Sequence, residues 1–65
     1  MTPEEAQERV ESIRSIRGDD EAAHSAEDRF RADVLEAIAN GSPHAVELAR
    51  IALTTGEIDF ARWCA

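Results

Sequence analysis

The chain has 65 residues, which is enough for one small domain, and its formal net charge of -7 makes it strongly acidic. A domain of this length leaves roughly 40% of its unfolded surface exposed, so a multidomain enzyme is excluded, and the single cysteine excludes an internal disulfide. All seven basic residues are arginines. The acidic surface disfavours direct contact with nucleic acid or an anionic membrane and favours a basic protein partner.

A first helix is predicted over residues 3 to 17. Thr2 and Glu5 have the spacing of a capping box, and Pro3 suits the first helical position. Gly18 is expected to end this helix in a left-handed conformation. The apolar stripe that the helix would bury comprises Ala6, Val10, Ile13 and Ile16.

A second helix is predicted to begin at Asp19 or Asp20, whose carboxylates can cap it, and to end at the pair Asn40-Gly41. Its periodic apolar positions form the strongest apolar face of the chain, so we expect Phe30, Val34 and Ile38 in the core. The whole face comprises Ala23, Ala26, Phe30, Val34, Ala37 and Ile38.

A third helix is predicted to begin at Ser42-Pro43, continue through Thr54 and stop at Thr55-Gly56. Its apolar positions cover nearly half of the helix circumference, which is wide enough to contact two neighbouring helices, and Ile51 lies outside that arc. The arc comprises Ala45, Val46, Leu48, Ala49, Ala52 and Leu53.

The last segment, residues 57 to 65, is predicted to form a turn capped by Asp59 and then a short helix. Its apolar anchors, Ile58, Phe60 and Trp63, would lie as a lid on the core. Because the connections between the predicted helices are short, consecutive helices should pack antiparallel. We therefore expect a single all-α domain over residues 1–65, a three-helix bundle with a short fourth helical segment at the C-terminal end.

One cluster has the composition of a metal site. Glu21, His24 and Asp28 share a helical flank at spacings of three and four, with Glu27 beside them, and a Glu-x-x-His element supplies metal ligands in di-iron helical bundles. Such sites also need matching ligands from other helices, so the alternative is a solvated acidic helix start. We expect no cofactor and no metal, and keep a metal-dependent or otherwise catalytic protein as the alternative.

The sequence offers little support for two further chemistries. Cys64 lacks an evident base and cleft, so it is interpreted as a small apolar residue beside Trp63, and we expect no enzyme. A helix-turn-helix would offer Arg50 as the only cation of its second helix; a nucleic-acid-associated regulator or DNA mimic remains an alternative. One cysteine and an acidic N-terminal stretch, where an export signal would be basic, predict a cytoplasmic protein.

A partner-binding surface is the leading expectation. Apolar contact from Ile51, Phe60 and Trp63 should anchor the partner, because bulky residues are few and aromatic side chains are frequent anchors. An acidic flank should steer a basic protein toward this surface, with a second copy of the chain as the other possible partner. The flank comprises Asp20, Glu21, Glu27 and Asp28.

Two stretches, residues 19 to 28 (DDEAAHSAED) and residues 57 to 65 (EIDFARWCA), together with the helix between them, resemble small orphan helical proteins of actinobacteria and their phages or prophages. The resemblance implies a GC-rich origin and a cytoplasmic setting, and it supplies no activity to transfer. Residues 1 to 18 lie outside it. The expected function is that of a non-enzymatic accessory protein, related to a phage or mobile element, which acts by binding another protein.

Overall fold

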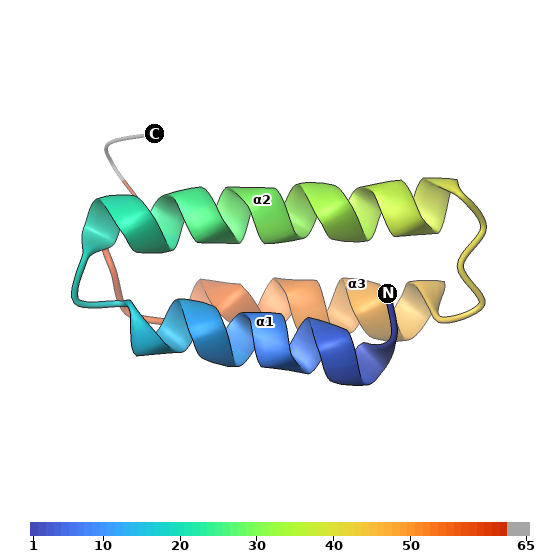
Figure 1. The fold of residues 1–65 in the computed structure, drawn as a ribbon, viewed down its shortest axis with the longest axis horizontal. Coiled ribbons are helices and arrows are strands. Elements are labelled where there is room, and N and C mark those ends of the chain that lie inside the picture. The colour runs from blue at the N-terminus through green and yellow to red at the C-terminus, as the bar shows by residue number, and fades with distance from the viewer. Residues whose placement is uncertain (63–65) are drawn as a thin grey trace.

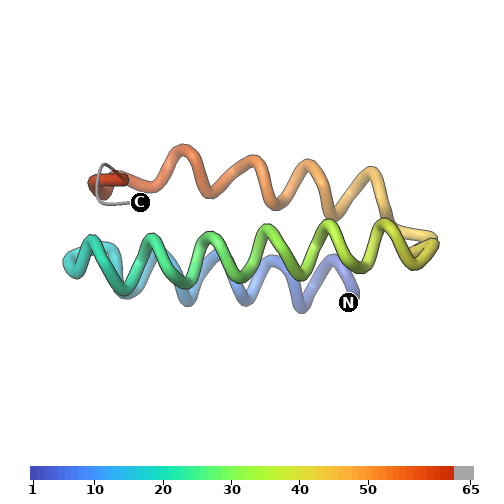
Figure 2. Tube along the Cα trace, turned by 90° about the horizontal axis from the view of Figure 1, so that it is seen from above, coloured from blue at the N-terminus to red at the C-terminus, as the bar shows by residue number. Residues whose placement is uncertain are grey.

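The computed structural model describes residues 1–62, which form three α-helices and contain no strand. These are α1 (Pro3–Ser15), α2 (Asp20–Ala39) and α3 (Ala45–Leu53), and α3 continues into a 3-10 helix, η1 (Thr54–Glu57). Both α1 and α3 run antiparallel to α2 and pack against it and against each other (Figures 1 and 2). The predicted all-α helical bundle is confirmed.

The first two helices begin where the capping residues predict. At the start of α1, Thr2 Oγ1 accepts a hydrogen bond from the Glu5 amide at 3.1 Å, and Glu5 Oε1 accepts one from the Thr2 amide at 2.7 Å. At the start of α2, the Asp19 carboxylate accepts a hydrogen bond from the Ala22 amide at 3.1 Å. These side chains satisfy amides that the helices themselves leave without partners.

The end of α1 differs from the prediction. The helix stops at Ser15, two residues early, and Gly18 has no left-handed backbone conformation. The helix instead tightens through bonds between residues three apart, from the Ile16 amide to the Ile13 carbonyl and from the Arg17 amide to the Arg14 carbonyl. Such a tightened last turn satisfies the final carbonyls without a left-handed residue. Ile16 therefore leaves the buried stripe and is 38% exposed.

The turn between α2 and α3 explains why α3 begins at Ala45 and not at Ser42-Pro43. Gly41 has a φ of 86°, its amide donates to the Ile38 carbonyl, and the Ser42 amide donates to the Ala37 carbonyl. This pair of bonds is the Schellman motif, which confirms Asn40-Gly41 as the end of α2. The Ser42 hydroxyl then accepts from the His44 amide within the turn, so it caps no helix.

The core lies along the axis of the bundle and draws on all three α-helices and on the segment that follows η1. Phe30 and Leu48 are fully buried, and Val34 is nearly so, whereas Ile38 is only partly buried at the edge. The buried apolar set comprises Ala6, Val10, Ile13, Ala23, Phe30, Val34, Leu48, Ala52, Ile58 and Phe60.

Residues 58–62, here called the strap, cross the end of the bundle from α3 to the first turn of α2 (Figure 1). Ile58 and Phe60 are buried, as the predicted lid requires, but the expected helix after Asp59 does not form over residues 59–62. The short fourth helical segment is η1, which lies earlier in the chain. Trp63 and Cys64 lie outside the described residues.

Candidate functional site

A buried ion pair joins α2 to the strap. Glu27 is 3% exposed, and its carboxylate accepts hydrogen bonds from Arg62 Nε at 2.9 Å and Arg62 Nη2 at 3.0 Å. The same guanidinium donates to the backbone carbonyls of Thr55, Ile58 and Phe60 at 2.9, 3.1 and 3.2 Å. It also stacks on the Phe60 ring, 3.8 Å from the centroid. The Arg62 side chain thus connects the strap to α2 and to η1.

A second arginine extends this cluster. Arg31 Nε and Nη2 donate to Thr55 Oγ1 at 3.1 and 2.9 Å, and Arg31 Nη2 lies 3.8 Å from Glu27 Oε2. Burial raises the pKa of Glu27, but its hydrogen-bonding partners Arg62 and Thr55, with the charges of Arg62 and Arg31, outweigh it and hold the pKa below its ordinary value. Glu27 is therefore a carboxylate at neutral pH.

The cluster has a structural role in the folded chain. Within residues 1–62, no buried side-chain nitrogen or oxygen lacks a hydrogen-bond partner, so Glu27 and Thr55 offer no unsatisfied group to a substrate. Glu27 was expected on an exposed flank that steers a partner, and the structure instead places it in the core. The remaining three acidic residues of that flank, Asp20, Glu21 and Asp28, are exposed, and Asp20 Oδ1 accepts a hydrogen bond from the Ala61 amide of the strap at 3.1 Å.

Within the predicted Glu21, His24 and Asp28 cluster, His24 and Asp28 lie close together. His24 Nε2 lies 3.5 Å from Asp28 Oδ2, and the His24 side chain is largely buried. No group of three or more histidine, cysteine, aspartate or glutamate side chains in residues 1–62 is arranged to hold a metal ion. The described structure therefore gives the metal-dependent alternative no ligand set.

Adding zinc is expected to leave the melting temperature of the protein unchanged, because a ligand raises it only by binding the folded state. Thermal unfolding with and without equimolar zinc, followed by elemental analysis of the dialysed protein, provides the measurement. A stoichiometric metal that is lost in His24→Ala would contradict this expectation and restore the metal-dependent alternative.

An apolar groove lies between α2 and α3. Two exposed leucines line it from opposite helices, Leu35 on α2 at 66% exposure and Leu53 on α3 at 72%. The groove has a volume of about 250 Å³, and its floor consists of Val34, Ile38, Ala49 and Ala52, with Arg31 as its one charged lining residue. Val46 is 65% exposed and lies two helical turns before Leu53, so the two side chains lie on the same face of α3.

This groove differs from the expected anchor set. Ile51 is partly buried and packs on the core, and Phe60 is 8% exposed beneath Arg62, so neither presents an open apolar surface. Trp63 lies outside the described residues. The wide apolar arc predicted for the third helix does extend beyond the core, because Val46 and Leu53 remain uncovered. Sequence reasoning missed Leu35, which lies away from the apolar face that carries Phe30 and is exposed at the edge of α2.

Comparison with protein-family models, with curated proteins and with solved structures finds no match to this chain. Function is therefore inferred from the chain's own residues. None of the helices in residues 1–62 is long and apolar enough to cross a membrane.

Two exposed carboxylates lie near one end of the apolar groove. Asp28 lies two helical turns before Leu35 on the same face of α2, and Glu57 follows Leu53 at the end of η1. Because α2 and α3 are antiparallel, these two exposed carboxylates lie toward the same end of the groove. Arg31 lies nearby, but its Nε and Nη2 atoms bind Thr55. The groove thus combines an apolar centre with an acidic end.

Proposed function

We propose that this protein is a small, non-enzymatic accessory protein that binds an amphipathic helix of a basic protein in the α2/α3 groove. The observation that carries the proposal is the exposure of Leu35 and Leu53, which line this groove from opposite helices, with Val46 also exposed two turns before Leu53. Large apolar side chains left in water on a small domain mark an interaction surface when they lie together. In keeping with the sequence, we propose a cytoplasmic protein related to a phage or mobile element.

A helix is the form of partner that this surface fits. Two antiparallel helices with apolar rows on their outer edges present the groove into which an amphipathic helix places residues spaced three, four and seven apart. Together with α1, α2 and α3, such a helix would complete a four-helix arrangement. The apolar contacts would supply most of the affinity, because exposed rim charges contribute little.

Charge complementarity selects a basic partner over a second copy of this chain. The protein carries a formal charge of -7, and a second copy would bring another -7 to the interface. A partner helix with lysine or arginine at one end would instead place its charge beside Asp28 and Glu57. Electrostatic attraction of this kind mainly accelerates association.

A synthetic amphipathic peptide of about 15 residues, with leucines on one face and lysines at one end, is expected to bind saturably in a fluorescence anisotropy titration. Leu53→Glu should weaken binding at least about tenfold, because it places a charge where the peptide buries its leucines. Ile16→Glu is the matched control, because Ile16 is also exposed but lies outside the groove, and it should leave binding unchanged.

Salt provides an independent measurement on the same complex. Raising ionic strength should slow association severalfold and leave dissociation nearly unchanged, and a peptide with glutamates in place of the lysines should bind more weakly. Equal binding of wild type and Leu53→Glu would contradict the proposal. Sedimentation that shows a dimer, dispersed by Leu53→Glu, would assign the groove to a second copy instead.

A further inference from the structure

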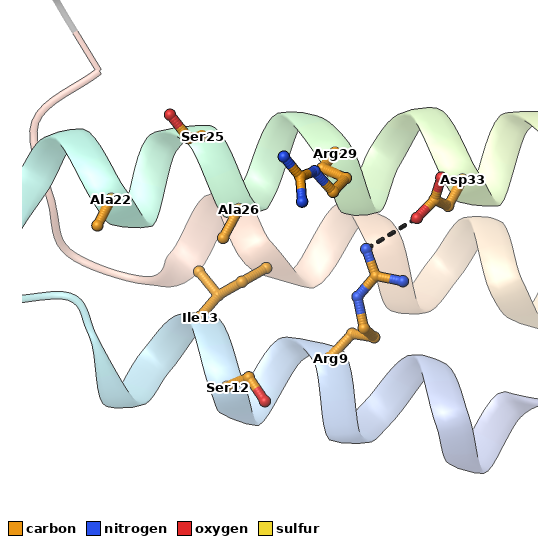
Figure 3. A pocket seen from close by; sticks show the side chains of 8 residues that line it. All are labelled: Arg9, Ser12, Ile13, Ala22, Ser25, Ala26, Arg29 and Asp33. Carbon is orange, nitrogen blue, oxygen red and sulfur yellow. Dashed lines mark hydrogen bonds and ion pairs between the residues drawn. The ribbon is translucent and has the colours of Figure 1, made fainter.

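A second groove, with a different chemistry, lies between α1 and α2 on another side of α2 (Figure 3). It has a volume of about 510 Å³, and guanidinium groups line it from both helices, Arg9 from α1 and Arg29 from α2. Ile13 and two alanines form its apolar part, and the hydroxyls of Ser12 and Ser25 lie on its two outer edges and point away from each other. We propose that this groove binds the phosphate group of a small organic phosphate.

Arg9 is held in place by two contacts. Its Nη2 atom donates to Asp33 Oδ2 at 3.0 Å, and its guanidinium carbon lies over the Phe30 ring, 5.3 Å from the centroid. A guanidinium has five N–H donors, so most of the donors of Arg9 remain for a ligand. A positioned cation loses less conformational entropy on binding than a freely moving one.

Arg29 supplies the second cation. It lies one helical turn before Asp33 on the same side of α2 (Figure 3), and within residues 1–62 it makes no hydrogen bond or ion pair. Ser25, a further turn toward the start of α2, is exposed, but its hydroxyl points away from α1 and Arg9. The Ser12 hydroxyl already donates to the Glu8 carbonyl at 3.0 Å. The donors for a ligand are thus the guanidiniums of Arg9 and Arg29.

This donor set favours a phosphate monoester. Its oxygens can accept from both guanidiniums, and arginine is well suited to bind phosphate in pairs of hydrogen bonds. The volume lies within the range of about 300–1,000 Å³ that small-molecule sites occupy. A polyanion such as nucleic acid would meet the repulsion of the whole acidic surface, whereas a small ligand meets mainly this local pair of cations.

Asp33 gives the proposed site a distinguishing property. Its carboxylate lines the same groove and occupies one donor of Arg9, so it opposes an incoming anion. Removing that charge should therefore strengthen phosphate binding, although it also removes a surface ion pair. If the Arg9–Asp33 pair served only to stabilise the fold, removing the Asp33 charge would not strengthen phosphate binding.

Titration of ¹⁵N-labelled protein with inorganic phosphate, at constant ionic strength maintained with chloride, tests the proposal. Saturable shift changes are expected at the amides of Ser25 and Arg29 and at the side chain of Arg9. Arg29→Gln should weaken binding at least about tenfold, because it removes one of the two guanidiniums that form charge-assisted hydrogen bonds to the phosphate. Asp33→Asn should strengthen it severalfold.

Arg50→Gln is the matched control, because Arg50 is an exposed arginine on α3 away from this groove, and it should leave phosphate binding unchanged. A parallel titration with glycerol phosphate asks whether an organic group adds affinity through Ile13 and the alanines. Shifts that never saturate, equal losses in Arg29→Gln and Arg50→Gln, or equal affinity for acetate would each overturn the proposal. If Asp33→Asn does not fold, Arg29→Gln still decides, because an exposed arginine is dispensable for folding.

Discussion

Phe30→Ala is expected to lower the free energy of unfolding by about 3–5 kcal/mol, because it leaves a cavity where a fully buried ring contacts the core. A domain of this length has a total stability of about 3–10 kcal/mol. The melting temperature should fall by about 15–30 °C, and much of the protein should be unfolded at room temperature. Thermal and urea unfolding followed by circular dichroism provides the measurement.

Leu35→Ala is the control for Phe30→Ala, because Leu35 lies on the same helix but is mostly exposed. It should change the stability by less than about 1 kcal/mol. A fully helical and equally stable Phe30→Ala variant would show that the core is packed on another face of α2.

Glu27→Gln is expected to destabilise the protein by about 2 kcal/mol at neutral pH. The amide keeps the shape of the carboxylate but leaves the Arg62 guanidinium beside Arg31 without a counter-charge. Breaking a fully buried pair costs about 3–5 kcal/mol, and the expectation is lower here because the Arg62 side chain is 34% exposed. Chemical denaturation of Glu27→Gln against Glu21→Gln, an exposed position on the same helix, gives the comparison.

The same pair predicts how stability depends on pH. The pKa of Glu27 is lower in the folded protein than its ordinary value of 4.5, so the folded state binds its proton less readily than the unfolded chain does. The ion pair therefore contributes fully above about pH 4.5, and its contribution is lost as the pH falls through the folded pKa. Wild type should lose more stability than Glu27→Gln between about pH 5 and 3.

Glu5 of the capping box also makes stability depend on pH in this range, because hydrogen bonds with the Thr2 backbone and side chain lower the pKa of Glu5. This contribution is the same in wild type and in Glu27→Gln. The difference between wild type and Glu27→Gln thus isolates Glu27. Parallel curves of stability against pH for the two proteins would contradict the proposed role of the buried ion pair.

The features that the sequence predicted well are those determined within a few residues. Thr2 with Glu5, Asp19, and Asn40-Gly41 each satisfy backbone groups of their own helix end, so their identity and spacing are informative by themselves. The start of α3 was misplaced because Ser42 has two possible roles, as a helix cap or as part of the preceding Schellman motif. Only the observed bonds of its amide and hydroxyl distinguish them.

The features that the sequence did not reveal depend on contacts between distant residues. Glu27 has the helical spacing of the core face, between Ala23 and Phe30, but its charge favoured the interpretation as part of an exposed acidic flank. Its partner, Arg62, is 35 residues away and reaches it only because residues 58–62 cross the bundle without forming a helix. The exposure of Leu35 and Leu53 likewise depends on how α2 and α3 pack, which periodicity alone does not determine.

The strap also bears on how the chain folds and how long it stays folded. Its bonds to α2 span 35 and 41 residues, from Arg62 to Glu27 and from Ala61 to Asp20, whereas each helix and its caps form within a few residues. Closing the longer loops costs more chain entropy, so we expect the strap to dock after the three helices have associated. Interactions made after the rate-limiting step slow unfolding without accelerating folding. The lifetime of the native state would then depend on Arg62, and the rate of its formation on the helices.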